Sequence, residues 1–453
     1  MQDKKIIEDF IVEKMVYGGY GFGFSSEGKP VFVEGAYTGE IVDIEITQEK
    51  KSLMYAKPIE RKLTASFRNA PVCKVYDKCG GCDWLDADYE KQLEFKKDMI
   101  IEQFERIAKM DIRDKTENVV ASPEKYQMRN KIEYEIALEN DKVVIGLKEK
   151  HSRNIVPTFG CKVIPSEFEK IRKHVEDLLN AWEEKNVYDR KKRRGNLKHL
   201  VIRKAFHDGN LMVIFVTHKE YFNNGKKISH ELRKKFPQIT SVIHVMNSSD
   251  KIALRGPYKT IYGAGVLYET VEWAKYHIPP ISFFQVNTSI LKPLLNTVKD
   301  LLSPEKNQKL LDLYGGSGLF SVYLAPLFSK VKTVEFSHAS ARIVAKNASV
   351  NEVTNLKSIE SDVELFLREE TGKYDAIIVD PPKSGLNDKV ISHLMKLSPD
   401  KLLYISCDPS TLARDTAKIT EEGYEIKKIV PFDMFPHTYH VETVVLMEKA
   451  KTI

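Results

Sequence analysis

The sequence predicts a chain of three parts: an all-β unit, then a mixed α+β region, then an α/β unit built on a parallel sheet. Two patterns support this fold class. Strand-type segments separated by glycines dominate residues 1–62, and segments of strand and helix type alternate from residue 276 onward. Because 453 residues allow two to four domains, we expect domains at 1–62, 63–275 and 276–453.

The composition is that of an ordinary soluble protein with a small positive charge. Hydrophobic residues make up 42% and charged residues 30% of the chain. The net charge of +6 favours a polyanionic partner only weakly. No apolar run approaches the roughly 20 residues that span a bilayer, and the first residues lack the apolar core of a signal peptide. We therefore expect a cytoplasmic protein without a membrane partner, whose thiols stay reduced.

The first unit is expected to be a small β-barrel. Residues 12–17, 31–34 and 40–47 have strand composition, and the last of these alternates strictly. Between the first two strands lies a run of glycines and aromatics at 18–24, where glycine permits sharp bends. Exposed aromatics on such a barrel would stack on single-stranded nucleic acid. The equally weighted alternative is that these aromatics form the core of a structural barrel.

The five cysteines fall into a group of four and a single residue. Cys73, Cys79 and Cys82 lie within ten residues of one another, and Cys161 can complete a set of four. In a reducing compartment such a set indicates a metal site or catalysis, not disulfides. Four thiolates suit tetrahedral zinc or an iron–sulfur cluster, and their spacing leaves both open. We predict a metal site here, against the alternative that the three clustered cysteines bind no metal and lie together by chance.

The middle region combines helices and strands. The apolar periodicity predicts one amphipathic helix over 89–109, with a packing role. Strands are expected at 132–138, 199–203 and 211–216. The basic stretch 185–199 is dense enough to contact phosphates, and a solvated loop is the equally weighted alternative.

A glycine turn in the last unit predicts a nucleoside cofactor. The buried strand 309–314 is followed by Gly315-Gly316-Ser317-Gly318 and then by a helix. Glu335 lies 20 residues after Gly315, at the end of the next strand, where a carboxylate can accept from ribose hydroxyls. The third glycine of a dinucleotide fingerprint is replaced by Ser321. A cofactor with a ribose and no pyrophosphate fits better, and S-adenosylmethionine is such a cofactor.

Cys407 occupies the position of a nucleophile. The strand 401–405 ends just before it, and Pro409 forbids the regular continuation of that strand. In an open parallel sheet this edge binds ligands. Position alone leaves a buried core thiol equally acceptable. Once the other four cysteines are assigned to a metal and a cofactor is placed at the same edge, the nucleophile is the better interpretation.

These motifs together resemble the S-adenosylmethionine-dependent RNA uridine-5-methyltransferases that carry an iron–sulfur cluster and a TRAM domain, an RNA-binding barrel of the OB type. The resemblance covers nearly the full length. One departure is Ile290, where many members have glutamine. The segments that carry the resemblance are the four grouped cysteines, Ser282 to Asn287, Asp312 to Ser321, Asp380-Pro381-Pro382, Ser406-Cys407-Asp408-Pro409 and His440-Val441-Glu442-Thr443.

The resemblance implies a TRAM barrel, a central domain with a [4Fe–4S] cluster and a Rossmann-like methyltransferase domain. It implies that Cys407 adds to C6 of uracil and that Glu442 removes the C5 proton. Phe283 would pack on the target base, and Arg129 would contact RNA. Ribosomal RNA of the 23S type is favoured over transfer RNA, and no obligate protein partner is expected. The implied cofactor residues are Gln285, Tyr314, Glu335 and Asp380, and the implied cluster ligands are Cys73, Cys79, Cys82 and Cys161.

Two rival functions are weaker. A base amino-methyltransferase would share the acid-Pro-Pro segment, but such segments usually continue with an aromatic, and here Lys383 follows. That enzyme would also need no cysteine. An inactive RNA-binding iron–sulfur protein would have no reason to keep both Cys407 and Glu442.

Overall fold

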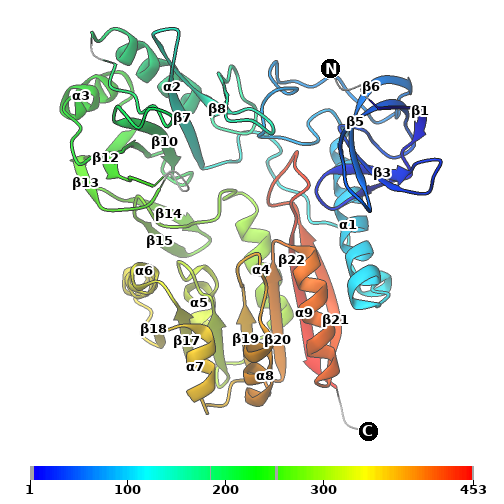
Figure 1. Ribbon diagram of the computed structural model, residues 1–453. Coiled ribbons are helices and arrows are strands. Elements are labelled where there is room, and N and C mark those ends of the chain that lie inside the picture. The colour runs from blue at the N-terminus through cyan, green and yellow to red at the C-terminus, as the bar shows by residue number, and fades with distance from the viewer. Residues whose placement is uncertain (1–4, 184, 250–253, 451–453) are drawn as a thin grey trace.

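The computed structural model describes residues 5–183, 185–249 and 254–450. The N-terminal sheet and the central region form two lobes, and the C-terminal sheet lies below both of them (Figure 1). Within the described residues, no helix has both the length and the apolar character needed to cross a bilayer.

The N-terminal unit is a strongly rolled six-stranded sheet with the order β1-β5-β6-β4-β3-β2. β1 and β2 are separated only by residues 12 and 13, and β1 pairs with β5 while β2 pairs with β3. The backbone N–H groups of Val12 and Glu13 donate to the carbonyls of Glu40 and Phe22 at 3.0 and 2.8 Å, so this one bent segment links the two ends of the sheet. Glycines let β1 fold over β3, because a Cβ built on Gly23 would lie 2.5 Å from the carbonyl oxygen of Ile11. The strands are β1 (Ile6–Ile11), β2 (Lys14–Val16), β3 (Tyr20–Phe24), β4 (Pro30–Glu34), β5 (Ile41–Glu49) and β6 (Met54–Leu63).

The aromatics of β3, β4 and β6 lie outside the core of this sheet. The core consists mainly of aliphatic residues such as Val31, Val33 and Ile44, and it includes the ring of Phe10 of β1. Phe24 is 49% exposed, and the other rings form edge-to-face or tilted pairs on the same face. Of the two alternatives for this segment, the structure therefore favours a surface of rings over a buried core. This aromatic face consists of Tyr20, Phe22, Phe24, Phe32 and Tyr55.

The central region contains a seven-stranded sheet with the order β13-β12-β11-β10-β7-β8-β9. Helices α2 and α3 pack on it through one apolar cluster. The elements are α2 (Ser166–Asn180), α3 (Gly225–Lys235), β7 (Lys131–Glu139), β8 (Lys142–Lys148), β9 (Ile155–Val156), β10 (Leu197–Lys204), β11 (Leu211–Thr217), β12 (Ile239–Met246), β13 (Tyr258–Gly263) and the hairpin β14 (Leu267–Val271) with β15 (Ala274–Ile278). The expected domain boundary at residue 275 lies inside β15.

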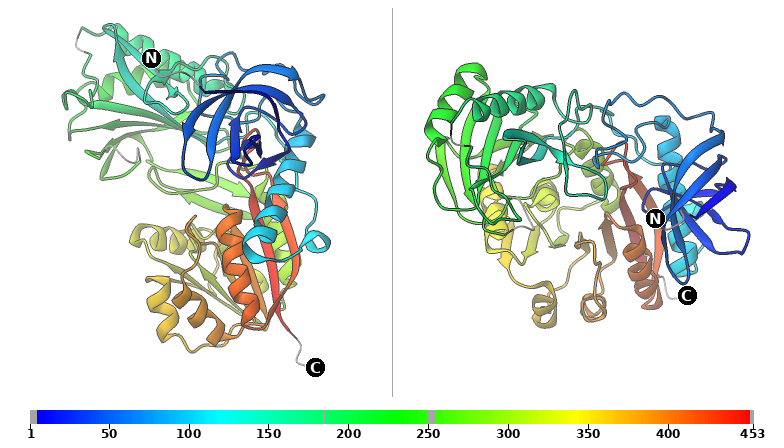
Figure 2. Two further views of the ribbon diagram at one scale, coloured as in Figure 1. Left: turned by 45° about the vertical axis from the view of Figure 1, so that its right-hand side comes forward. Right: turned by 45° about the horizontal axis from the view of Figure 1, so that its top comes forward.

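The predicted helix at 89–109 is α1 (Tyr89–Gln103), which continues as the π-helical turn η1 (Phe104–Ala108). Lys109 then ends it with φ 58°. A short 3₁₀ turn, η2 (Arg113–Lys115), follows. Figure 2 shows α1 beside the N-terminal sheet and close to α9. Its buried side includes the polar residues Gln92 and Lys96 as well as apolar ones.

The C-terminal sheet has the order β18-β17-β16-β19-β20-β22-β21. Its first five strands are parallel, as expected of a doubly wound fold. The last strand along the chain, β22, is not at the edge of the sheet: it inserts antiparallel between β20 and the edge strand β21. The strands are β16 (Lys309–Leu313), β17 (Lys330–Glu335), β18 (Leu356–Glu360), β19 (Ala376–Val379), β20 (Lys401–Ser406), β21 (Tyr424–Phe432) and β22 (Glu442–Lys449).

Two apolar clusters cover the two faces of this sheet. One contains α4 and α5 and continues into the central region. The other contains α7, α8, α9 and η1. The helices are α4 (Leu291–Leu302), α5 (Leu319–Leu324), α6 (His338–Val350), α7 (Val363–Glu369), α8 (Asp388–Leu397) and α9 (Pro409–Glu421), with the 3₁₀ turn η3 (Ala325–Leu327). Both faces are thus covered, and the carboxyl edge of the strands is left for ligands.

Candidate active site

Cys407 lies directly after β20 and before α9. Asp408 is the N-cap of α9, and its Oδ1 accepts from the backbone N–H groups of Ser410 at 2.9 Å and Thr411 at 3.1 Å. Pro409 occupies the first turn, where its missing N–H costs nothing. The sharp change from strand to helix therefore holds the cysteine at the carboxyl edge of the sheet.

Strand register places Glu442 opposite Cys407. Ser406 of β20 pairs with Thr443 of β22 in an antiparallel ladder. The residue after Ser406 and the residue before Thr443 are therefore neighbours across the two strands. Two segments 35 residues apart in the sequence thus meet at one point of the sheet edge.

The electrostatics of this pair favour the protonated forms. Burial chiefly raises the pKa of Cys407 to about 11, and the carboxylates of Glu442, Asp380 and Asp408 add to this, while Lys383 lowers it. Glu442 is 4% exposed, and burial followed by the charge of Asp380 raises its pKa well above the ordinary value. Lys383 opposes both shifts, so it is the cation that favours the two anionic forms.

Two further carboxyl groups lie on the neighbouring strands. Asp380 follows β19, and Asp312 is in β16, and burial raises the pKa of each to about 7. Weak hydrogen bonds from the hydroxyl and the backbone N–H of Ser321 lower the pKa of Asp312, yet within the described residues neither carboxyl oxygen has a partner of good hydrogen-bond geometry. Buried acceptors that are satisfied so poorly can receive a cationic or hydrogen-donating ligand group. Sequence reasoning did not single out Asp312.

The glycine turn has the backbone that close ligand approach requires. Tyr314, Gly316 and Gly318 all have positive φ values, of 62°, 56° and 79°. A Cβ on Gly316 would meet no atom within 4 Å, so this part of the turn borders open space.

Glu335 lies beside the turn, as the sequence predicts. Its Oε2 accepts from the backbone N–H of Gly316 at 3.0 Å, and its Oε1 accepts from that of Ser337 at 2.9 Å. The next residue, Phe336, is 74% exposed and was missed by sequence reasoning. The signal in the sequence is an aromatic residue directly after this carboxylate.

Residues 281–287 connect the central region to this edge. Phe283 is 64% exposed. The backbone carbonyl of Gln285 accepts from the side-chain amide of Asn130 at 2.8 Å, and the adjoining Arg129 forms a β-bridge with Asn287. Asn287 in turn donates to the carbonyl of Met434 at 3.2 Å.

The four grouped cysteines (Cys73, Cys79, Cys82 and Cys161, here the four-thiol group) lie close enough for their charges to interact. Burial raises the pKa of Cys82 to about 12 and that of Cys161 to about 11. Within the described ranges, however, no three or more His, Cys, Asp or Glu side chains are grouped so as to hold a metal ion. The expected metal centre is therefore not preformed as a single-ion site.

Arg129 lies beside the four-thiol group. Its charge lowers the pKa values of Cys79 and Cys82. Its Nε is buried, and it has no hydrogen-bond partner in the described part of the chain. Arg129, which the resemblance assigns to RNA contact, thus lies beside the thiols in the structure.

The segment after Cys82 holds the loop that leads to Glu442. The backbone N–H groups of Asp83 and Trp84 both donate to the carbonyl of His437, at 2.9 and 3.0 Å. Lys96 of α1 forms a fully buried ion pair with Asp433 at the start of the same loop. In Figure 1 this red loop rises from the C-terminal sheet to meet the two upper lobes.

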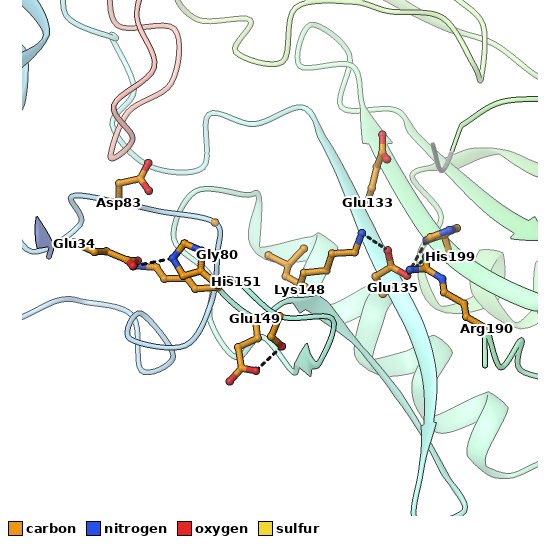
Figure 3. A pocket seen from close by; sticks show the side chains of 14 residues that line it. Glu34, Gly80, Asp83, Glu133, Glu135, Lys148, Glu149, His151, Arg190 and His199 are labelled. Carbon is orange, nitrogen blue, oxygen red and sulfur yellow. Dashed lines mark hydrogen bonds and ion pairs between the residues drawn. The ribbon is translucent and has the colours of Figure 1, made fainter. Parts of the chain in front are cut away.

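A large hollow of about 630 Å³ lies away from Cys407, between the N-terminal sheet and the central sheet. Figure 3 shows several of its charged side chains paired with one another, for example Glu135 with Lys148 and Arg190. Its lining has five carboxylates against three lysine or arginine side chains, so it has the wrong sign for a phosphate backbone. Its remaining charged residues are Glu34, Asp83, Glu133, Glu149 and Lys150, together with His151 and His199.

The basic stretch 185–199 divides into two parts. Arg190 pairs with Glu135 at 3.0 Å, and Lys198 donates to the backbone carbonyl of Asn247 at 2.9 Å, so both serve the fold. Residues 191–194 form an exposed turn. Only this turn could contact phosphates.

Comparison with known proteins identifies the family. A family model described as tRNA (uracil-5-)-methyltransferase matches residues 88–450. An uncharacterized RNA methyltransferase of Thermotoga maritima is 40% identical over 444 residues, 98% of this chain and 99% of that protein. One of Clostridium tetani is 32% identical over 424 residues, 92% of this chain and 91% of that protein.

A solved structure agrees. The tRNA (uracil-54, C5)-methyltransferase of Pyrococcus abyssi, in complex with S-adenosyl-L-homocysteine, matches with a TM-score of 0.77 and 27% identity. The match covers 97% of this chain and 100% of that one. The chain therefore belongs to the tRNA (uracil-5-)-methyltransferase family, and it is an S-adenosylmethionine-dependent RNA methyltransferase that modifies uracil at C5.

Proposed function

We propose that this protein methylates one uridine in ribosomal RNA, with Cys407 as nucleophile and Glu442 as base. The observation that most supports these two catalytic roles is the β20–β22 register, which sets a thiol and a carboxyl opposite each other at the ligand edge of the sheet. A nucleophile and a base at one point are what addition to uracil C6 followed by loss of the C5 proton requires.

In the proposed reaction the Cys407 thiolate forms a bond to C6 of uracil, which gives C5 the character of an enolate carbon. S-adenosylmethionine, when bound, supplies an electrophilic methyl group to C5. The Glu442 carboxylate then takes the C5 proton, the C5–C6 double bond re-forms, and the Cys407 sulfur leaves C6 as a thiolate. Cys407 and Glu442 both favour their protonated forms in the free protein, but the reaction needs the thiolate and the carboxylate. We propose that the positive charge of Lys383 favours these two anionic forms.

The proposed cofactor site lies along the carboxyl ends of β16, β17 and β19. Glu335 and the glycine turn would hold the ribose, Tyr314 and Gln285 would flank it, and Asp380 would face the reacting end. We add two residues to the predicted cofactor-binding residues. The poorly satisfied carboxyl of Asp312 fits a positively charged group, and the exposed ring of Phe336 fits an adenine face.

We propose that the four-thiol group holds a [4Fe–4S] cluster with a structural role. The donor set fits, because these are one buried and three half-buried thiols from two segments, and their charges act on one another. Arg129 beside them favours the thiolate forms that a cluster needs. A cluster here would fix Asp83 and Trp84, and through them the loop before Glu442.

The aromatic face of the N-terminal sheet and the ring of Phe283 are the proposed contacts for unpaired RNA bases. The target base must leave its stack before it can reach Cys407. Transfer RNA is the second candidate substrate, because the Pyrococcus abyssi neighbour acts on it and matches this chain over 97% of its length. Because that match extends over the N-terminal sheet as well, the presence of this sheet does not by itself favour ribosomal RNA over transfer RNA.

The test is to map 5-methyluridine in the RNA of a strain that lacks this protein and to restore it with the purified protein. Loss and restoration at one ribosomal uridine would support the proposal, and loss in transfer RNA alone would move the substrate to the second candidate. Methylation of a base nitrogen, or full activity of Cys407→Ala, would instead favour an amino-methyltransferase. No methyl transfer to any RNA would favour the inactive binding protein.

A further inference from the structure

A turn of the N-terminal sheet reaches the catalytic edge of the C-terminal sheet. Residues 17–19 connect β2 to β3, and Gly18 and Gly19 have φ values of 104° and 84°. The turn is held between two aromatic residues of other segments. A Cβ on Gly19 would lie 3.1 Å from the ring of Tyr439, and the indole N–H of Trp84 donates to the carbonyl of Gly19 at 3.3 Å.

The first residue of this turn contacts the residue next to the nucleophile. The hydroxyl of Tyr17 donates to Oδ2 of Asp408 at 3.1 Å, and its ring lies edge-on to Tyr439 with 5.5 Å between centroids. The other oxygen of Asp408 already caps α9. Both carboxylate oxygens of Asp408 are therefore held, one by the helix it caps and one by the N-terminal sheet.

We propose that Tyr17 is a positioning residue for the nucleophile: it fixes the carboxylate of Asp408 and, through it, the orientation and reactivity of the Cys407 sulfur. The N-terminal sheet then forms one side of the catalytic site, in addition to any contact it makes with RNA. This inference rests on the proposed role of Cys407.

The hydrogen bond also has an electrostatic effect. The charge of Asp408 raises the pKa of Cys407, and a hydroxyl that donates to that carboxylate offsets part of its charge. Removal of the hydroxyl should therefore disfavour the thiolate, whereas neutralisation of Asp408 should favour it. The titratable groups whose charges act on Cys407 or that lie against it are Glu442, Lys383, Asp380, Asp408 and Tyr17.

The experiment measures the alkylation of Cys407 by iodoacetamide as a function of pH, in the full-length protein without RNA or cofactor. Mass spectrometry of the peptide that contains Cys407 separates it from the other four cysteines. For Tyr17→Phe we expect the profile to move to higher pH and the rate at pH 8 to fall about two- to fivefold. Asp408→Asn, which keeps a side chain able to cap α9, should move the profile to lower pH.

Two controls separate positioning from a general loss of stability. Tyr424→Phe removes another buried tyrosine hydroxyl bond, 2.7 Å to the carbonyl of Pro399 at the opposite end of the sheet, and should leave the profile unchanged. In the background of Asp408→Asn, the Tyr17→Phe change should have no further effect on the profile.

The proposal is overturned if Tyr17→Phe alkylates like the wild type, if Tyr424→Phe shifts the profile equally, or if the two substitutions act independently. Methyl transfer from labelled cofactor is measured in parallel. Absence of transfer by the wild type would refute the proposed function, while the alkylation profile would still report on the contact of Tyr17 with Asp408.

Discussion

Cys407 and the four-thiol group are both partly or fully buried sulfur sites, but different neighbours act on them. Around Cys407 the charged neighbours are carboxylates and one lysine. Around Cys82 they are mainly other thiols and Arg129. A lone thiol facing an acid is suited to covalent catalysis, whereas thiols facing one another are suited to bind a metal centre.

The two sites also differ in how the chain builds them. Adjacent strands of one sheet bring Cys407 and Glu442 together, so local structure and one ladder determine where this pair lies. The four-thiol group joins loop residues 73–82 to Cys161, and hydrogen bonds from residues 83 and 84 connect it to the loop before Glu442. We therefore expect substitutions at the Cys407 site to impair catalysis, and substitutions in the four-thiol group to impair the structure that supports it.

The largest effect is expected from Cys407→Ser. A serine hydroxyl is a much weaker nucleophile than a cysteine thiolate, so methyl transfer should fall by at least about 10³-fold. Bound iron and the midpoint of thermal unfolding should stay at the wild-type values. The assay is transfer of labelled methyl to RNA, and residual activity above about one tenth would contradict the covalent role.

The second largest effect is expected from Glu442→Gln. The amide cannot take the C5 proton, so turnover should fall by about 10²- to 10⁴-fold, and the adduct between Cys407 and methylated uracil should accumulate. Denaturing gel electrophoresis with labelled RNA detects this adduct. A variant that is slow but accumulates no adduct would place the base elsewhere.

Asp312→Asn should weaken cofactor binding and change the dependence of stability on pH. Loss of a charge-assisted contact should reduce affinity by about 10- to 100-fold in calorimetry. Because folding raises the pKa of Asp312 to about 7, this residue favours the folded state at low pH, and that stability is lost as pH rises toward 7.

The same variant should therefore unfold at a higher temperature than the wild type at pH 8 and at about the same temperature at pH 4, without cofactor. Asp375→Asn is the matched control, because Asp375 precedes β19 at the opposite end of the sheet. Equal affinities for the cofactor in Asp312→Asn and wild type would remove Asp312 from the site.

Cys82→Ser should have the smallest effect on the chemistry. We expect loss of bound iron and a lower midpoint of unfolding, because metal binding and folding are coupled, with methyl transfer reduced less than about tenfold at low temperature. Iron content and calorimetry measure this. If Cys82→Ser leaves both iron content and stability unchanged, the four-thiol group does not hold a cluster.

The sequence was informative where one short segment determines the structure. The strand that ends at Cys407 and the strand before the glycine turn were predicted because apolar runs and glycines mark them locally. The insertion of β22 between β20 and β21 was missed, because strand order depends on long-range pairing. The buried face of α1 was also underestimated, since Gln92 and Lys96 have the composition of a solvent-exposed side.

The supporting contacts could not be predicted from sequence for a related reason. Tyr17 meets Asp408 across 391 positions of the chain, and Arg129 meets the thiols only after the central sheet has formed. The burial of Asp312 depends on the strands that flank β16 on either side, which composition does not reveal. Such contacts between remote side chains require the assembled fold.

The central claim is that Cys407 bonds to C6 of uracil, and RNA that contains 5-fluorouridine at the target site tests it most directly. Fluorine at C5 cannot leave as a proton does, so the reaction should stop at the covalent adduct. With S-adenosylmethionine present, the wild type should form a protein–RNA complex that survives denaturation, with Cys407 as the modified residue, and Cys407→Ala should form none. A complex of equal yield with Cys407→Ala, or attachment at another residue, would contradict the account.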